Sequence, residues 1–203
     1  MAPITVLTEK FAQALNTAYS LHHNQYRKDQ KTPYLAHLLA VTALVLEDGG
    51  SETEAIAALL HDAVEDQGGL ATRQIIQEQF GEAVINIIDS CTESETIPKP
   101  PWQERKQRYL QQIQQASLSA QRVSLADKLH NATDILRALE TEGDIVWQRF
   151  TEGKTGILWF YQALLEVYQS ETKQSYLFRQ VNKIVNQLAT ISSIANIEDN
   201  LAN

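Results

Sequence analysis

The sequence is poor in the residues that build disulfide frameworks, tight turns and basic surfaces. A single cysteine, Cys91, excludes an intrachain disulfide and favours a reducing compartment. Only eight glycines and five prolines interrupt 203 residues, so long stretches are free to form regular secondary structure. Lysine and arginine number 17 against 25 aspartates and glutamates. The net charge of −8 argues against a polymeric nucleic acid as partner, because binding one needs a broad basic surface.

A secretory signal and a membrane-spanning segment are also missing. Residues 1–20 lack the basic start and unbroken apolar run of a signal peptide. No stretch approaches the roughly 20 apolar residues that cross a bilayer. We therefore expect a cytoplasmic protein without a membrane partner. A small anionic ligand in a locally basic pocket is compatible with the acidic composition, because the charge of a pocket need not follow the net charge. These features do not determine the oligomeric state.

Apolar residues recur with helical period along most of the chain, without strand alternation or internal repeats. The whole chain, 1–203, is therefore expected to form one all-α domain, a bundle of about ten helices with no significant β-sheet. We expect a frayed tail over 191–203. The pattern predicts helices over 4–22, 33–48, 52–66, 71–80, 82–92, 101–116, 119–140, 143–152, 154–171 and 173–190.

Local signals mark several helix ends. Thr32 followed by Pro33 is typical of an N-cap and the first helical position. Gly49 and Gly50 can adopt the left-handed conformation that ends a helix. Ser51 and Glu54 have the spacing of a capping box, which predicts a helix start at this point.

The segment AIAALLHDAVED at residues 55–66 combines an apolar face with an acidic one. At about 100° per residue, the opposite sides of this helix separate cleanly. An exposed acidic helix end is one interpretation, but the small side chains of Ala57 and Ala58 beside the polar face favour close packing by another element. The apolar face carries Ile56, Leu59, Leu60, Ala63 and Val64, and the polar side carries His61, Asp62, Glu65 and Asp66.

A second segment, residues 122–139, repeats this division. Asp127, Asn131 and Asp134 follow one another at i, i+4 and i+7, opposite a stripe of leucines and alanine. Two such rows facing each other would bury several carboxylates, and a divalent cation would offset that cost. Imidazoles and carboxylates without thiolates suit Mn²⁺, Fe²⁺ or Zn²⁺ better than Ca²⁺. Spacing alone does not choose the further histidine ligand among His22, His23, His37 and His130.

Together these motifs resemble the HD superfamily of metal-dependent phosphohydrolases, whose signature is H…HD…D. The resemblance is closer to the hydrolase domain of the RelA/SpoT alarmone enzymes and their small single-domain relatives, and it covers roughly residues 10–140. The helices over 143–190 diverge from that family. The matching segments are His22-x-x-Gln25-x-Arg27-Lys28-Asp29, Thr32-Pro33-Tyr34-Leu35-Ala36-His37, Ala58 to Asp66, Phe80-Gly81, Cys91-Thr92 and Leu125 to Asn131.

The resemblance implies a role for individual residues. The family's metal, usually Mn²⁺, would be held by His37, His61, Asp62 and Asp127. Its catalytic pair would be Glu65 and Asp66. Substrate contacts would come from Arg27, Lys28 and Asn131, and Asp134 stands where the long alarmone enzymes have threonine. His37 is followed by Leu38 where the family often has proline, and neither departure removes a metal ligand.

The region after residue 140 offers weaker expectations. Lys154 is a surface lysine or a phosphate contact, and Arg105 and Lys106 carry the same two interpretations. Trp159, Phe160 and Tyr161 are expected to be core aromatics rather than a platform for a nucleobase.

Three functions follow as hypotheses. The first is a guanosine 3′,5′-bis(diphosphate) 3′-pyrophosphohydrolase, which releases pyrophosphate and, since no synthetase module follows, only hydrolyses the alarmone. The second is a phosphohydrolase acting on another nucleotide, such as the 2′-phosphate of NADPH or a nucleoside phosphate. The third is a catalytically silent nucleotide-binding module, and the intact Glu65-Asp66 pair counts against it.

Overall fold

The computed structural model describes residues 4–94 and 98–201, with side chains described through residue 191, and these ranges are helical apart from short connections. The elements are α1 (Glu9–His22), α2 (Tyr34–Glu47), α3 (Glu52–Leu60), α4 (Ala63–Asp66), α5 (Leu70–Phe80), α6 (Glu82–Cys91), α7 (Trp102–Gln115), α8 (Leu118–Glu142), the 3₁₀ helix η1 (Gly143–Arg149), α9 (Gly153–Val167), α10 (Ser170–Lys173) and α11 (Tyr176–Leu201).

The all-α prediction is confirmed. Within the described ranges the only extended pairing is an isolated bridge between Tyr26 and Pro33. The described helices include none that is both long and apolar enough to cross a membrane.

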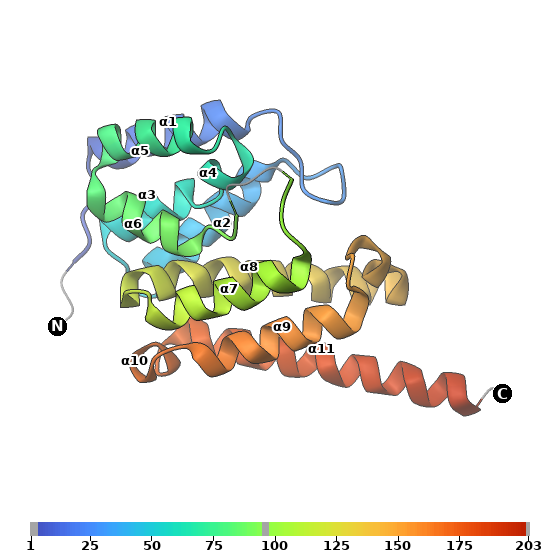
Figure 1. Cartoon of the computed structure of the whole chain (residues 1–203). Helices are drawn as coiled ribbons and strands as arrows, with labels where there is room; N and C mark the ends of the chain where they lie inside the picture. Colours follow the sequence, from blue (N-terminus) through green and yellow to red (C-terminus); the bar gives the residue numbers. More distant parts are fainter. Residues whose placement is uncertain (1–3, 95–97, 202–203) are drawn as a thin grey trace.

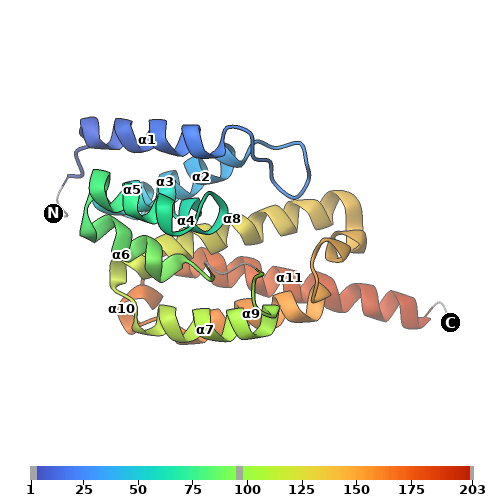
Figure 2. The same cartoon turned by 45° about the horizontal axis from the view of Figure 1, so that its top comes forward.

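The long helix α8 is the centre of the bundle (Figure 1). It packs against α2, α3 and α6 on one side and against η1 and α11 elsewhere along its length. Helices α1 and α5 lie on the far side of α3 from α8, and α9 and α11 lie on the opposite side of the molecule (Figures 1 and 2). Because α8 touches both halves, its polar residues are positioned between the motif-bearing helices and the C-terminal helices.

The structure confirms several helix ends and corrects others. Ser51 and Glu54 form the capping box that starts α3, and Gly49 adopts φ +81° just beyond α2. The first helix begins at Glu9 rather than residue 4, because Thr8 accepts a hydrogen bond from the backbone N–H of Lys10 as the N-cap. Pro33, not Thr32, is the N-cap of α2, since the Thr32 hydroxyl donates to Asp29 instead.

The sequence predicted one helix over 52–66, whereas the structure divides it. Helix α3 ends at Leu60, His61 and Asp62 form a turn, and α4 begins at Ala63. Every residue from Glu54 to Leu60 is buried, because α1, α2, α6 and α8 all pack around α3. The turn therefore places His61 and Asp62 at the end of an element that is fixed on all sides.

The C-terminal boundaries also differ from the sequence pattern. The predicted helix over 143–152 is the 3₁₀ helix η1, and α9 ends at Val167 because Tyr168 is extended. The last helix continues to Leu201, where the sequence predicted a frayed tail. Phe160 and Tyr161 are buried and Trp159 packs against the core, as the sequence predicted.

Candidate metal centre and active site

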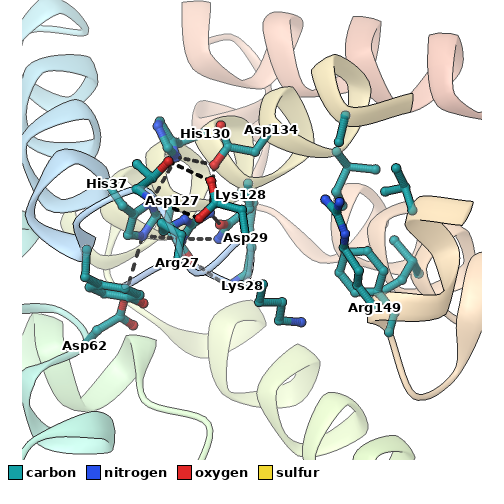
Figure 3. Close-up of a pocket in the computed structure, with 18 of the residues that line it drawn as sticks. Arg27, Lys28, Asp29, His37, Asp62, Asp127, Lys128, His130, Asp134 and Arg149 are labelled. Carbon is teal, nitrogen blue, oxygen red and sulfur yellow. Dashed lines mark hydrogen bonds and ion pairs between the residues drawn. The ribbon is translucent and has the colours of Figure 1, made fainter. Parts of the chain in front are cut away.

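Two histidines and two aspartates from three parts of the fold converge beside α8, and Figure 3 shows three of them, His37, Asp62 and Asp127. His37 comes from α2, His61 and Asp62 from the turn after α3, and Asp127 from α8. The ligand atoms of His37, His61 and Asp127 all lie within 4.8 Å of one another. The Oδ2 atom of Asp62 adds a fourth, at 3.1 Å from His61 Nε2 and 3.6 Å from His37 Nε2.

The ring of His61 has one nitrogen bonded and one available. Its Nδ1 lies 2.8 Å from the carbonyl oxygen of Ala58, which can only accept, so Nδ1 carries the proton. Its Nε2 is buried, without a hydrogen-bond partner in the described structure, and lies beside the two carboxylates. A buried nitrogen of this kind fits a metal ligand, because a neutral imidazole offers a lone pair on Nε2 when Nδ1 donates.

His37 is oriented by a second histidine. Its Nδ1 lies 2.9 Å from Nδ1 of His130, while its Nε2 lies 3.3 Å from Oδ1 of Asp127. Burial and the proximity of His37 lower the pKa of His130 to about 4, so His130 is neutral at pH 7. In the tautomer with its proton on Nε2, His130 accepts a hydrogen bond from Nδ1 of His37. With its proton on Nδ1, His37 presents the lone pair of Nε2 to the cluster.

The two carboxylates are held by donors from neighbouring elements. Asp127 accepts from Asn131 at Oδ1 and from Lys128 Nζ at Oδ2, the latter at 2.6 Å. Asp62 accepts at Oδ2 from the hydroxyl of Tyr34, also at 2.6 Å. Burial disfavours the charged form of Asp127, but the Lys128 ammonium and the contacts with His37 and His61 together outweigh it and keep the pKa of Asp127 well below its usual value. The carboxylate therefore remains ionised and can ligate a cation.

The electrostatics favour positive charge at the centre of this cluster. Burial alone would lower the pKa of His61, yet Asp62 and Asp127 raise it well above its ordinary value. A divalent ion bound to the two lone pairs and two carboxylates would satisfy the same demand, and the mixed nitrogen and oxygen donors suit a transition metal.

Glu65 and Asp66 follow this cluster on α4 and differ in their contacts. Both oxygens of Glu65 accept hydrogen bonds, one from Lys99 Nζ at 2.7 Å and one from the backbone N–H of Glu93 at 3.0 Å. Asp66 accepts from Gln25 Nε2 at 2.9 Å. Burial raises the pKa of Asp66, and the negative charge of Asp62 raises it further. The pair therefore consists of one tightly held carboxylate and one in a setting that favours protonation.

A loop over residues 25–33 brings the basic side chains of Arg27 and Lys28 close to the candidate metal cluster. Its ends are joined by backbone hydrogen bonds from Arg27 to Thr32 and from Tyr34 to Gln25. A terminal guanidinium nitrogen of Arg27 donates to Asn131 at 2.7 Å and to Asp134 at 2.8 Å. The structure thus brings three of the predicted substrate contacts together in one hydrogen-bonded group.

Most of these groups line one cavity of about 850 Å³, including His37, Asp62 and Asp127, whereas His61 is buried and is not among its lining residues. Lys28 extends into it, with Nζ 4.4 Å from the centre of the Phe150 ring, and Arg149 lies across it from the metal cluster (Figure 3). Lys106 also lines it and pairs with Glu93. Two of the predicted contacts, Lys154 and Arg105, are not among the lining residues; Arg105 instead pairs with Glu93 at 3.0 Å.

A family model described as "HD domain" matches residues 14–158. The chain belongs to the HD-domain family. The family assignment made from the sequence motifs is thereby confirmed, and the matched range extends past the motifs into η1 and α9.

Curated relatives of this HD domain include alarmone hydrolases. The chain is 41% identical over 128 residues to guanosine-3′,5′-bis(diphosphate) 3′-pyrophosphohydrolase MESH1 of Xenopus tropicalis, a match that covers 62% of this chain and 69% of the relative. It is 29% identical over 126 residues to guanosine-3′,5′-bis(diphosphate) 3′-pyrophosphohydrolase of Borreliella burgdorferi, covering 61% of this chain but 18% of that longer protein.

Two solved structures have the same fold as this HD domain. One is described under the words "a metazoan ortholog of SpoT hydrolyzes ppGpp and plays a role in starvation responses". It superposes with a TM-score of 0.72 at 25% identity, covering 90% of this chain and 97% of the other. A protein of Listeria monocytogenes EGD-e superposes with a TM-score of 0.67 at 30% identity, covering 75% and 97%.

Several residues that support the HD-domain site were not assigned this role in the sequence analysis, where His130 was considered only as an alternative ligand. Tyr34, Lys128 and His130 each bond to a candidate ligand, although all three stand within the quoted motifs. The sequence signal for these residues was their position next to a candidate metal ligand or one helical turn from it. Arg149 had no comparable signal, because only the packing of η1 brings it to the cavity.

Proposed function

We propose that this protein is a guanosine 3′,5′-bis(diphosphate) 3′-pyrophosphohydrolase. The observation that carries the proposal is a cavity of about 850 Å³ lined by His37, Asp62 and Asp127 of the candidate metal cluster, by the Glu65-Asp66 pair and by several basic side chains. This volume is in the range of sites that enclose small ligands. The activity named for the 41% identical MESH1 supports the same substrate.

His37, His61, Asp62 and Asp127 would hold one divalent ion. Mn²⁺ is our first choice because of the family resemblance, and Fe²⁺ or Zn²⁺ suits the same nitrogen and oxygen donors. Such a site supplies Lewis-acid chemistry at a phosphate oxygen and lowers the pKa of water.

The reaction then needs groups that move protons. A water oxygen attacks the phosphorus attached to the ribose 3′ oxygen, and the bond between that phosphorus and the 3′ oxygen breaks. We assign Glu65 to orienting the water and Asp66 to accepting its proton. The 3′ oxygen leaves with the proton that Asp66 took from the water, and the products are GDP or GTP and pyrophosphate.

The basic loop would bind the diphosphate groups. Arg27 and Lys28 offer charge-assisted hydrogen bonds to phosphate oxygens, and Asn131 and Asp134 hold the guanidinium of Arg27 in place. Lys154 stays a prediction from the sequence and has no part in this proposal, because it does not line the cavity.

A hydrolysis screen tests the proposal. The metal-stripped protein is supplied with Mn²⁺, Fe²⁺ or Zn²⁺ and assayed on ppGpp, NADPH and a nucleotide panel, with pyrophosphate and orthophosphate measured separately. Pyrophosphate and GDP from ppGpp are expected. Orthophosphate from NADPH or another nucleotide, with ppGpp left intact, would refute the proposed substrate. Glu65→Gln should bind the metal as the unmodified protein does but turn over slowly, which separates the catalytic role from ligation.

A further inference from the structure

A glutamine at the end of α1 connects three side chains around the active site. Gln25 Oε1 lies 2.6 Å from Nδ1 of His22 and 2.7 Å from Nε2 of Gln67, while Gln25 Nε2 lies 2.9 Å from Oδ2 of Asp66. His22 and Gln25 belong to the first matching motif of the sequence, yet neither has a part in metal ligation or substrate binding as described above.

The contacts fix the orientation of this amide. Asp66 is ionised when it serves as the proton acceptor, and its carboxylate can then only accept, so the NH₂ group of Gln25 faces it and the oxygen faces the other two partners. Gln67 donates to that oxygen through its own NH₂ group. His22 must then donate from Nδ1, which leaves its Nε2 unprotonated. That nitrogen is buried without a hydrogen-bond partner in the described structure, which agrees with this tautomer.

Each member of the network is immobilised by further contacts. His22 is 1% exposed and its ring stacks on Tyr34, with centroids 5.5 Å apart and planes 16° from parallel. Burial lowers the pKa of His22, so the ring is neutral. The backbone of Gln25 donates to His22 and accepts from Tyr34. The amide therefore starts from a rigid base, as expected of a group that orients a neighbour.

We propose that Gln25, held by His22 and Gln67, is a positioning residue that fixes the Asp66 carboxylate for proton transfer. It binds one oxygen of Asp66, and within the described structure no protein group bonds to the other oxygen, Oδ1. Glu65 differs, because donors occupy both of its oxygens. The arrangement holds the carboxylate in one rotamer while leaving an oxygen for the reacting water. This inference rests on the proposed function only in that Asp66 moves the proton.

A purely structural tether makes a different prediction from a positioning residue. Loss of a loop tether lowers stability, or weakens substrate binding by displacing Arg27 in the same loop. Loss of a positioning group lowers kcat, with little effect on KM or on metal affinity, because the ground-state contacts remain.

Gln25→Met tests this distinction, since it keeps the length of the side chain and removes both hydrogen-bonding groups. We expect kcat to fall about 10-fold or more, with KM and Mn²⁺ affinity within about threefold of the unmodified protein. Gln74→Met is the matched control, because Gln74 donates to Glu78 at 3.0 Å on the exposed face of α5. Gln74→Met should leave kcat, KM and Mn²⁺ affinity unchanged. A Gln25→Met protein with unchanged kcat, or with only a raised KM, overturns the proposal.

A pair of substitutions at His22 supplies the rescue. The Nδ2 group of asparagine is attached to Cγ, as Nδ1 of histidine is, so His22→Asn retains a donor toward Gln25 whereas His22→Leu does not. We expect kcat close to that of the unmodified protein for His22→Asn and reduced about 10-fold for His22→Leu. Equal losses in both variants would contradict the proposal.

A measurement without substrate or metal tests the geometry by itself. Nitrogen-15 NMR of the imidazole should show His22 as a neutral ring with the proton on Nδ1, and the signals should change in Gln25→Met but not in Gln74→Met. A proton on Nε2 would refute the network.

The two proposals can fail separately. If the unmodified protein spares ppGpp but hydrolyses another nucleotide, the proposed substrate is wrong. The kcat values of the variants are then measured on that nucleotide and still test the role of Gln25.

Discussion

The cavity has two walls that are built in different ways. We call the group formed by His37, His61, Asp62 and Asp127 the metal wall, and the group formed by Lys28, Lys106 and Arg149 the basic wall. All of these residues except the buried His61 line the cavity, and Figure 3 labels His37, Asp62, Asp127, Lys28 and Arg149. On the metal wall each side chain is fixed by a further residue of the fold, such as His130 or Tyr34. On the basic wall the cations contact aromatic rings or pair with a carboxylate.

The difference follows from burial. His37 and His61 are at most 3% exposed, and a buried polar group without a partner is costly, so the metal wall needs a complete network. The cations of the basic wall face a cavity that water can enter, so they need fewer fixed partners. We therefore expect single substitutions on the metal wall to abolish function and those on the basic wall to weaken substrate binding by degrees.

The largest effect is expected for Asp62→Ala. Loss of this carboxylate removes a ligand and leaves His61 Nε2 with one acidic neighbour, so metal binding should be lost and turnover should fall at least about 10³-fold. Bound metal is measured by elemental analysis after dialysis. The control is Asp89→Ala on α6, which removes a carboxylate that pairs with Arg73 of α5 and should leave the metal content unchanged. Normal metal content in Asp62→Ala would show that the metal wall is assigned incorrectly.

Removal of the buried ammonium of Lys128 should cost stability. Lys128→Met leaves the Asp127 carboxylate without its paired cation, which is expected to destabilise the metal-free protein by about 3–5 kcal/mol. Added Mn²⁺ should stabilise this variant more than the unmodified protein, because the ion supplies the missing charge. Urea unfolding with EDTA or with Mn²⁺ measures both quantities.

The basic wall provides the control for this experiment. Lys106 is a partly buried lysine that is also paired with a carboxylate, that of Glu93, but it does not contact a candidate ligand. Lys106→Met should therefore lose stability without any extra gain from Mn²⁺. An equal gain in both variants would show that the two walls do not differ in this respect.

Much of the metal wall could be predicted because its information is local. Asp127, Asn131 and Asp134 share a face of α8 through helical spacing, and the HD dipeptide follows a helix that packing buries on all sides. What spacing could not provide was the break after Leu60 and the choice of His37 among the histidines. The break depends on tertiary packing around α3, and the choice needed the family resemblance.

The basic wall could not be predicted in the same way. Arg149 and Phe150 lie at the end of a 3₁₀ helix, where α-helical spacing does not give the direction of a side chain. Lys106 reaches the cavity only because α7 packs against α9. Residues whose position depends on how distant helices pack leave no periodic signal in the sequence.

A smaller loss is expected when the support of a ligand is removed. His130→Phe takes away the acceptor for Nδ1 of His37 while filling the same space, so Mn²⁺ affinity should fall about 10- to 100-fold without loss of folding. Calorimetric titration measures the affinity. His23→Phe, at an exposed position at the end of α1, should bind Mn²⁺ as the unmodified protein does. Unchanged affinity in His130→Phe would mean that the network of the metal wall does not orient His37.

The smallest effect should come from the basic wall. Lys28→Met removes an ammonium that lies 4.4 Å from the Phe150 ring and keeps the aliphatic stem. Loss of one charge-assisted contact to a phosphate is worth about 1.5 kcal/mol, so KM for ppGpp should rise about 10-fold, with kcat and Mn²⁺ affinity nearly unchanged. Lys31→Met, at an exposed position in the same loop that does not line the cavity, should leave KM unaltered. If Lys28→Met lowered kcat or metal content instead, the two walls would be coupled, because a side chain of the basic wall would then control the chemistry at the metal wall.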